Sequence, residues 1–402
     1  MSAILTGFVG RQRAEIDGDR ILRIYGVVLG CIELICVLWL TSVHADKVLG
    51  PGGEVLCWPM LPNCGDYRIL GIDQVRALLV TLGLLSLSSA IAFWRRWRGA
   101  WVLLFVTEIL KLVVMAQDFR FRQNQFYMFF FVWFAFLFLP NKRRTIRYLA
   151  VLFYFWAGFL KLNTEWLSGA ALYGPKWFIQ YGTLVRICCT YVVVLELVIV
   201  WGLLAERAKF FWIAFAQIFL FEAFSWFTVN FFYPLLMLGI ISIFPLCRLE
   251  RAPAREAPLR LRGEPISTWV YLILFCLLQM IPRAFPGDSA VTGEGRLFAL
   301  HMFDARVECK STATLLKNGR VAHVYDLRPG LPIRTACDPI VVLSRGKTLC
   351  ARFSAAPYQV DIQLESKRSS DSIMLPLIDI KDFCRNVPQY RWWRHNDWIR
   401  SK

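Results

Sequence analysis

A lysine at the end of an apolar segment is the residue of this sequence best suited to chemistry. Lys161 follows the run 154–160, which belongs to a segment of membrane length. An ionisable amine in hydrocarbon is costly, so it either extends to the lipid headgroups or faces a partner or a cavity. Desolvation favours the neutral amine, and a neutral amine can act as a general base. Lys161 is therefore the first candidate catalytic residue.

Further polar side chains lie in the apolar segments or at their ends. They are Glu33, Glu108, Lys111, Glu196, Gln217, Glu222 and Asn230, with Asn124 and Gln125 at the entrance of one segment. Polar groups in hydrocarbon must face each other or a cavity. Glu108 and Lys111 are three residues apart, so they can pair on one helix. Glu33 and Glu196 have no such neighbour in the sequence and are candidates for a protonated carboxyl group.

The elements that must position these residues are those of a membrane protein. Of the 402 residues, 57% are hydrophobic, and the mean hydropathy is +0.47, which is too apolar for a soluble domain. Runs long enough to cross a hydrocarbon core of roughly 30 Å recur in the membrane domain, 1–283, and are missing from the outer domain, 284–402. We predict nine spans, at 24–43, 75–94, 100–117, 124–140, 146–163, 184–204, 209–228, 230–246 and 267–283.

Lysines and arginines between the predicted spans set the orientation. If the spans alternate, the basic clusters at 95–98, 142–144 and 248–262 fall on one side together with the basic N-terminus. The positive-inside rule makes that side the cytoplasm, in a plasma or inner membrane, and places the C-terminal domain outside. The residues that then fall in the outer half of the membrane are Lys161, Asn124, Gln125 and Glu222. We attribute the net charge of +17 to this topology and not to a nucleic-acid surface.

The outer domain has the patterns of a small β-rich fold. Apolar and polar residues alternate at 306–316 and 358–365, which predicts strands, and Asn318-Gly319 is a hairpin signal. Asp338-Pro339 predicts the start of a helix that runs to about Phe353. The predicted fold class is an α-helical multi-span membrane bundle of about nine transmembrane helices, followed by a β-rich extracytoplasmic C-terminal domain.

The cysteines on the predicted outer side are even in number, in a compartment that permits disulfides. They are Cys57, Cys64, Cys309, Cys337, Cys350 and Cys384, with Cys57 and Cys64 as the nearest local pair. Their spacing fits neither a zinc site nor the Cys-x-x-Cys of a dithiol oxidoreductase. The sequence also lacks a Gly-rich phosphate loop and a nucleophile elbow. We therefore expect chemistry without a metal.

Three stretches of the membrane domain carry motifs. The segment 157–169 reads A-G-F-L-K-L-N-T-E-W-L-S-G, Asn124-Gln125-Phe126-Tyr127 leads to Phe138-Leu139-Pro140, and Phe221-Glu222 precedes the run 232–238. They resemble A-G-x-x-K-L-x-x-x-W-x-x-G, N-H-x-Y…F-L-P and F-H…F-x-x-x-M-L of the vitamin K-dependent γ-carboxylase family, the proteins with a horizontally transferred transmembrane (HTTM) domain. Weaker similarity to the outer segments of carboxylase-type members lies at 297–303, 325–329 and 338–339.

The resemblance implies an oxygen-dependent enzyme. In carboxylases of this family a lysine deprotonates reduced vitamin K, oxygen adds, and the resulting strong base removes a proton from a peptide glutamate, which takes up CO2. By position, Lys161 is that lysine and Glu222 is a second catalytic residue. The residues implied at the quinone are Asn124, as a donor to its carbonyl, Gln125, Tyr127 and Trp166.

The cofactor that the resemblance implies is reduced vitamin K or menaquinol, with O2 and CO2 as co-substrates and no metal. The implied partners are membrane lipid or quinone and a secreted peptide or protein, and not nucleic acid.

The chain departs from the family motifs at three positions. Gln125 and Glu222 stand where the family has histidines, and Leu160 stands where many members have a second lysine. Glutamine can donate a hydrogen bond but cannot carry a proton, and Glu222 can pair with Lys161 and hold it charged. Two alternatives follow. One is a non-catalytic HTTM protein for maturation or export of a secreted peptide. The other is a transporter or lipid-binding scaffold, for which broken spans in two related halves are expected and not found.

Overall fold

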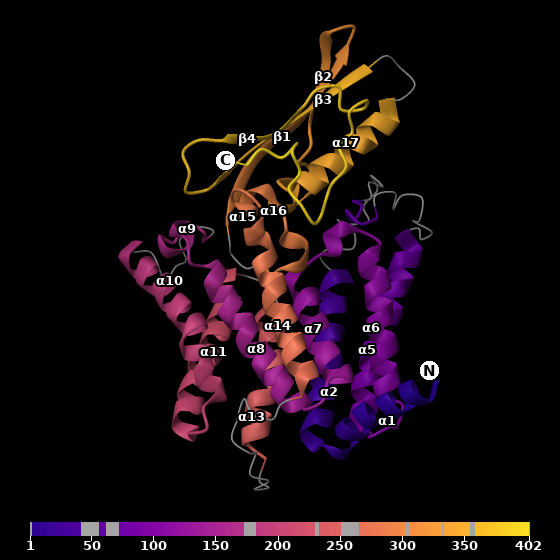
Figure 1. The fold of residues 1–402 in the computed structure, drawn as a ribbon, viewed down its shortest axis with the longest axis vertical. Helices are drawn as coiled ribbons and strands as arrows, with labels where there is room; N and C mark the ends of the chain where they lie inside the picture. Colours follow the sequence, from indigo (N-terminus) through magenta and orange to yellow (C-terminus); the bar gives the residue numbers. More distant parts are fainter. Residues whose placement is uncertain are drawn as a thin grey trace.

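A bundle of helices with a small antiparallel sheet at one end makes up the fold (Figure 1). The computed structural model describes residues 2–41, 56–61, 72–172, 182–229, 233–250, 265–301, 305–331, 333–353 and 358–401. The bundle helices are α1 (Ser2–Gly18), α2 (Arg20–Trp39), α5 (Ile72–Trp94), α6 (Ala100–Ala116), α7 (Asn124–Phe138), α8 (Lys142–Leu160), α10 (Gly182–Leu197), α11 (Ala208–Val229), α12 (Tyr233–Ile241), α13 (Ile243–Arg248) and α14 (Ile266–Met280).

Helix α2 illustrates how the sequence builds this bundle. The Asp19 side chain caps it by accepting from the Leu22 N–H at 3.1 Å, which satisfies one of the free donors of the first turn. Gly30 then lets α2 approach α5, because a Cβ at this position would lie 2.9 Å from the backbone of Ser86 and of Ala90. Small residues at such a crossing permit the close packing on which helix association in membranes depends.

Five helical segments in the described residues are long and apolar enough to cross a membrane. They are Arg20–Trp39, Arg76–Trp94, Gly182–Leu204, Ala208–Phe227 and Ile266–Ala284, and Gly182–Leu204 combines α10 with the 3-10 helix η3 (Ile199–Leu204). They coincide with five of the predicted spans and are compatible with a multi-pass membrane protein. The prediction of nine spans is not supported.

The other four predicted spans form helices that are shorter or more charged. Helix α6 has 17 residues and includes Glu108 and Lys111, and α7 has 15 residues. Helix α8 starts with the basic run 142–144, and the predicted span 230–246 is divided into α12 and α13 by Ser242. Most side chains of α7 and α8 are buried against other helices. Their apolar character therefore serves contacts inside the bundle, which periodicity in the sequence cannot distinguish from contact with lipid.

The outer domain contains the predicted sheet. Its strands β1 (Val307–Lys317), β2 (Arg320–Asp326), β3 (Tyr358–Arg368) and β4 (Leu375–Ile380) pair antiparallel in the order β2-β1-β3-β4. The hairpin signal is confirmed, because Asn318 and Gly319 have φ angles of 51° and 75° in the turn that pairs Lys317 with Arg320.

Helix α17 (Pro339–Phe353) begins and ends where the sequence predicts, and the Asp338 carboxylate accepts from the Ile340 N–H at 3.0 Å. Disulfides join Cys309 to Cys337 and Cys350 to Cys384. The sequence predicts that Cys57 pairs with Cys64, and Cys64 lies outside the described residues.

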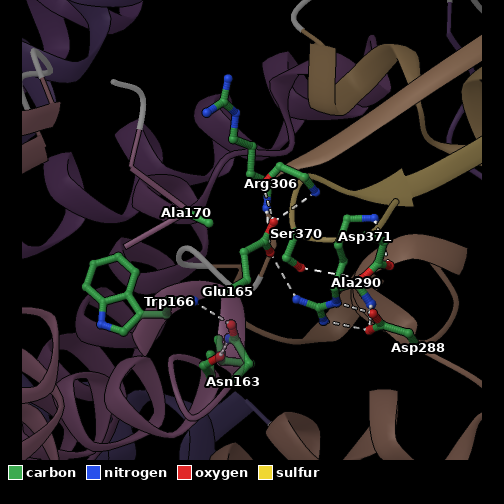
Figure 2. Close-up of polar contacts among 12 residues, drawn as sticks. Asn163, Glu165, Trp166, Ala170, Asp288, Ala290, Arg306, Ser370 and Asp371 are labelled. Atoms are coloured by element: carbon green, nitrogen blue, oxygen red, sulfur yellow. Dashed lines mark hydrogen bonds and ion pairs between the residues drawn. The ribbon is translucent and has the colours of Figure 1, made fainter. Parts of the chain in front are cut away.

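A buried glutamate joins the outer domain to the bundle. Glu165 belongs to the short helix α9 (Thr164–Leu167), which follows the end of α8, and its side chain is fully buried. Its carboxylate accepts from the Arg306 N–H at 3.1 Å and the Ser369 N–H at 3.0 Å, and pairs with Arg368 at 3.2 Å (Figure 2). Arg368 also donates a hydrogen bond of 2.9 Å to Asp288. The chain just after Lys161 is thereby fixed to the start of β1 and the end of β3, which pair with each other in the sheet.

Candidate functional site

A cavity of about 450 Å³ lies where the bundle meets the outer domain. Helices α8, α10 and α11 contribute Tyr154, Glu196 and Glu222 to its wall, and Lys161 joins them from the C-cap position of α8. The outer domain contributes arginines from η5 (Arg296–Phe298) and α16 (Ile333–Ala336). Small-molecule sites in proteins span roughly 300–1,000 Å³ and combine apolar walls with a few polar groups. The cavity fits that description.

Lys161 forms a buried ion pair with Glu196 in the wall of this cavity. Its Nζ lies 2.5 Å from each carboxylate oxygen, and the two side chains are 2% and 1% exposed. Gly158 allows the pair to form, because a Cβ at this position would lie 2.8 Å from the Cβ of Glu196. The Trp166 ring centroid lies 5.2 Å from Nζ, within the range of a cation–π contact. Lys161 is thus held in an ion pair and is not the isolated amine that the sequence suggests.

The alternative in which Glu222 pairs with Lys161 is wrong for this structure. Glu222 instead accepts a hydrogen bond of 2.6 Å from the Tyr154 hydroxyl. Tyr154 lies in α8 and Lys161, the C-cap of that helix, follows seven residues later, so both lie on one face, two turns from each other. That face meets α10 through Glu196 and α11 through Glu222. Two acid-containing pairs therefore border one cavity.

Three of the residues predicted to bind a cofactor line this cavity: Asn124, Gln125 and Trp166. The Asn124 amide donates to the His301 carbonyl at 2.6 Å and accepts from the His301 N–H at 2.9 Å, so one amide hydrogen is left for a ligand. Gln125 is buried and donates to Gln123. The Trp166 indole donates to the Cys189 carbonyl at 3.0 Å, which fixes its ring beside Lys161.

The fourth predicted cofactor residue, Tyr127, lines a different cavity of about 290 Å³. Its hydroxyl donates to the Phe298 carbonyl and accepts from Gln279 Nε2 at 2.8 Å. Arg122, Asn124 and His301 border both cavities, so they form a partition between Tyr127 and the Lys161 site.

A group of basic side chains faces the cavity from its other wall. Arg122 follows the 3-10 helix η2 (Phe119–Phe121) and contacts the His301 ring, to which Arg296 Nε also donates at 2.9 Å. Burial and the neighbouring arginines hold the pKa of His301 well below its ordinary value, so this imidazole is neutral. Burial, together with Arg296 and Arg334, lowers the pKa of Arg122 to about 10.

Sequence reasoning missed several residues of the site. The sequence analysis identifies Glu196 as a carboxyl group in an apolar segment but assigns it no partner, because Lys161 is 35 residues away in the chain. The sequence analysis gives no role in the site to Arg122, Arg296, Arg334 or His301. The sequence does contain a signal for Glu196: a buried lysine requires a buried charge of opposite sign, and Glu196 is a glutamate in an apolar segment.

A second buried charge cluster lies away from this cavity. Lys111 pairs with Glu108, as the three-residue spacing predicts, and with Glu33 at 2.9 Å. All three side chains are at most 2% exposed, and Lys111 also lies 4.4 Å from the Phe129 ring centroid. Glu33, which has no neighbouring partner in the sequence, is therefore paired through tertiary structure, because α2 and α6 bring together residues that are distant in the sequence.

Comparisons of the chain with protein families, curated proteins and solved structures give no match. The γ-carboxylase-like assignment accordingly stays a prediction from the sequence motifs.

Proposed function

We propose that this protein is a γ-carboxylase-like membrane enzyme that couples oxygenation of a quinol to modification of glutamate in a secreted peptide. The observation that carries the proposal is the Lys161–Glu196 pair, buried in the wall of a 450 Å³ cavity between the bundle and the outer domain. An N-terminus in the cytoplasm and an outer domain outside the cytoplasm are part of the proposal. A peptide would then approach from the outer domain and a quinol from the membrane.

The cavity suits a quinol in size and in chemistry. Aromatic walls from Phe153, Tyr154, Trp166 and Phe221 can stack on a ring, and Lys161 supplies a polar contact at one end. Reduced vitamin K or menaquinol would supply the electrons for reaction with O2 and, through that reaction, the basicity needed to deprotonate a glutamate side chain that then takes up CO2. A site closed to water keeps the strongly basic intermediate of such a reaction from being quenched by solvent.

The ion pair can move a proton without leaving an unbalanced buried charge. A carboxylate oxygen of Glu196 accepts the proton of a ligand hydroxyl, and the Lys161 ammonium, released from its partner, stabilises the negative charge left on the ligand oxygen. The pair as a unit is thus the base, in place of Lys161 alone. Tyr154 and Glu222 form a second proton-carrying pair on the same wall.

The direct test is turnover by the purified protein. We expect incubation with reduced menaquinone or vitamin K, O2, bicarbonate and glutamate-bearing peptides to give quinone epoxide and carboxylated peptide. Lys161→Met and Glu196→Gln should each abolish both products. Lys111→Met is a matched control, because it removes a buried, paired lysine that does not line the Lys161 cavity. Equal background product from wild type and Lys161→Met would refute the enzyme.

A second candidate is supported by the same pair. Both oxygens of Glu196 lie against Lys161 Nζ, which is also the arrangement of a structural ion pair. In that case the protein is a non-catalytic HTTM protein for maturation or export of a secreted peptide. Loss of peptide secretion in Lys161→Met cells, without any epoxide from the wild type in vitro, would favour this candidate.

A further inference from the structure

Two buried carboxylates share one lysine inside the bundle. Lys111 Nζ lies 2.9 Å from a carboxylate oxygen of Glu33 and also contacts the carboxylate of Glu108. The three side chains are at most 2% exposed. Glu33 belongs to α2, whose segment Arg20–Trp39 is long and apolar enough to cross a membrane. An ionisable cluster at such a place must be balanced internally, because neither lipid nor solvent compensates its charge.

The surroundings of the cluster supply no second cation in the described part of the chain. From α7 the Phe129 ring faces it, with a centroid 4.4 Å from Lys111 Nζ. The further titratable group that interacts electrostatically with all three side chains is the buried thiol of Cys36, on α2. Within the described residues, Lys111 is the one cation that forms an ion pair with either glutamate. With all three groups ionised, the cluster holds one negative charge in excess.

Two carboxylate oxygens of the cluster accept no hydrogen bond from the described residues. They are Oε1 of Glu33 and Oε1 of Glu108, and both are buried. A buried acceptor without a partner is costly, and a protonated carboxyl group gains an O–H donor that an ionised one lacks. The Lys161–Glu196 pair differs, because one ammonium group there balances one carboxylate. The cluster of Lys111 is short of one positive charge and one donor, and a single proton supplies both.

The geometry points to a proton-binding site formed by Glu33, Glu108 and Lys111, in which the two carboxylates share one proton. Like charges in one buried site cannot both stay ionised, so the proton adds to an oxygen of one carboxylate while Lys111 balances the other. A metal ion is a poorer match, since the described residues contain no group of three His, Cys, Asp or Glu side chains that could hold one. Lys111 also lines the cavity of about 290 Å³ beside Tyr127, so the site adjoins that cavity.

Folding equilibria of the full-length protein, measured against pH in detergent micelles, test this site. Above about pH 4.3, where an ordinary glutamate ionises, the unfolded chain releases a proton that the folded chain keeps. The site should therefore lower the folding equilibrium constant by about tenfold for each unit that the pH rises between about 5 and 7. Glu33→Gln and Glu108→Gln each leave a one-to-one pair with Lys111. Subtracting the curve of either variant from that of the wild type should show this tenfold dependence, because contributions from other groups cancel.

A matched variant and a second readout complete the test. Glu308→Gln makes the same substitution at a side chain that is 39% exposed on the outer domain, and it should keep the pH dependence of the wild type. Infrared difference spectra of wild type minus either single variant should show the carbonyl band of a protonated carboxyl group near neutral pH. The acid that remains in each variant is ionised by Lys111. The double variant Glu33→Gln/Glu108→Gln leaves Lys111 without a counter-charge and should be less stable than either single variant.

Three results would overturn the site. One is a single variant that keeps the pH dependence of the wild type. Another is a wild-type spectrum without the carboxyl band relative to both single variants. The third is stabilisation of the wild type by Na⁺ at constant ionic strength that both variants lose, which would make this a cation site. None of these measurements uses quinol, and none of the three residues lines the Lys161 cavity, so the outcome is separable from that of the proposed enzyme.

Discussion

Removing one partner of the Lys161–Glu196 pair should destabilise the protein far more than removing both. The two side chains are almost completely buried, so Lys161→Met leaves a carboxylate without its counter-ion, and Glu196→Gln leaves an ammonium group without its counter-ion. Breaking a buried ion pair in this way typically costs about 3–5 kcal/mol. The double variant Lys161→Met/Glu196→Gln buries no unbalanced charge, and we expect its free energy of unfolding to lie within about 1–2 kcal/mol of the wild type.

The expected coupling follows from these values. If each single variant loses about 4 kcal/mol and the double variant about 1 kcal/mol, the interaction energy is about 7 kcal/mol, well above the values of 0.5–3 kcal/mol usual for neighbouring residues. Glu222→Gln provides a comparison on the same cavity wall. Glutamine keeps an oxygen that accepts from the Tyr154 hydroxyl, so its loss should be about 1 kcal/mol.

Reversible unfolding in mixed detergent micelles, followed by the fluorescence of the 16 tryptophans, measures the wild type and the four variants. Loss of free energy in the double variant equal to the sum of the two single losses would refute the pair as an energetic unit. The same result would remove the basis for treating Lys161 and Glu196 as a joint proton acceptor.

Three further predictions concern the outer domain and its junction with the bundle. Glu165→Gln removes the charge that pairs with Arg368, and we expect it to raise the rate at which a protease separates the two domains by about tenfold. Arg368→Gln should have the same effect. An unchanged cleavage rate would contradict this role. Because the pKa of His301 is depressed, the unfolded chain binds a proton that the folded chain does not. Stability should therefore fall as the pH drops below about 6.5, by up to about 1.4 kcal/mol per pH unit, and His301→Gln should remove that slope in unfolding measured against pH. Reduction of Cys309–Cys337, which closes a loop of 28 residues, should destabilise the outer domain by about 3–4 kcal/mol in calorimetry, and a transition that dithiothreitol does not shift would count against it.

The sequence by itself determined those features that depend on local pattern. Long apolar runs identify membrane-compatible helices because hydrocarbon tolerates only apolar side chains over that length. The hairpin at Asn318-Gly319 and the helix that begins after Asp338 follow from backbone preferences of single residues, and both are confirmed. The Glu108–Lys111 pair lies within one helix, and its spacing alone predicts it.

Tertiary structure alone decided which distant side chains meet. Glu196 pairs with Lys161 because Gly158 brings α8 and α10 together, and Glu222 meets Tyr154 because α11 packs nearby. The helices long and apolar enough to cross a membrane are likewise fewer than predicted, since apolar residues inside a bundle and apolar residues in lipid have the same pattern in sequence. The energy of a buried charge depends on its neighbours in space, and helix packing sets these neighbours independently of chain order.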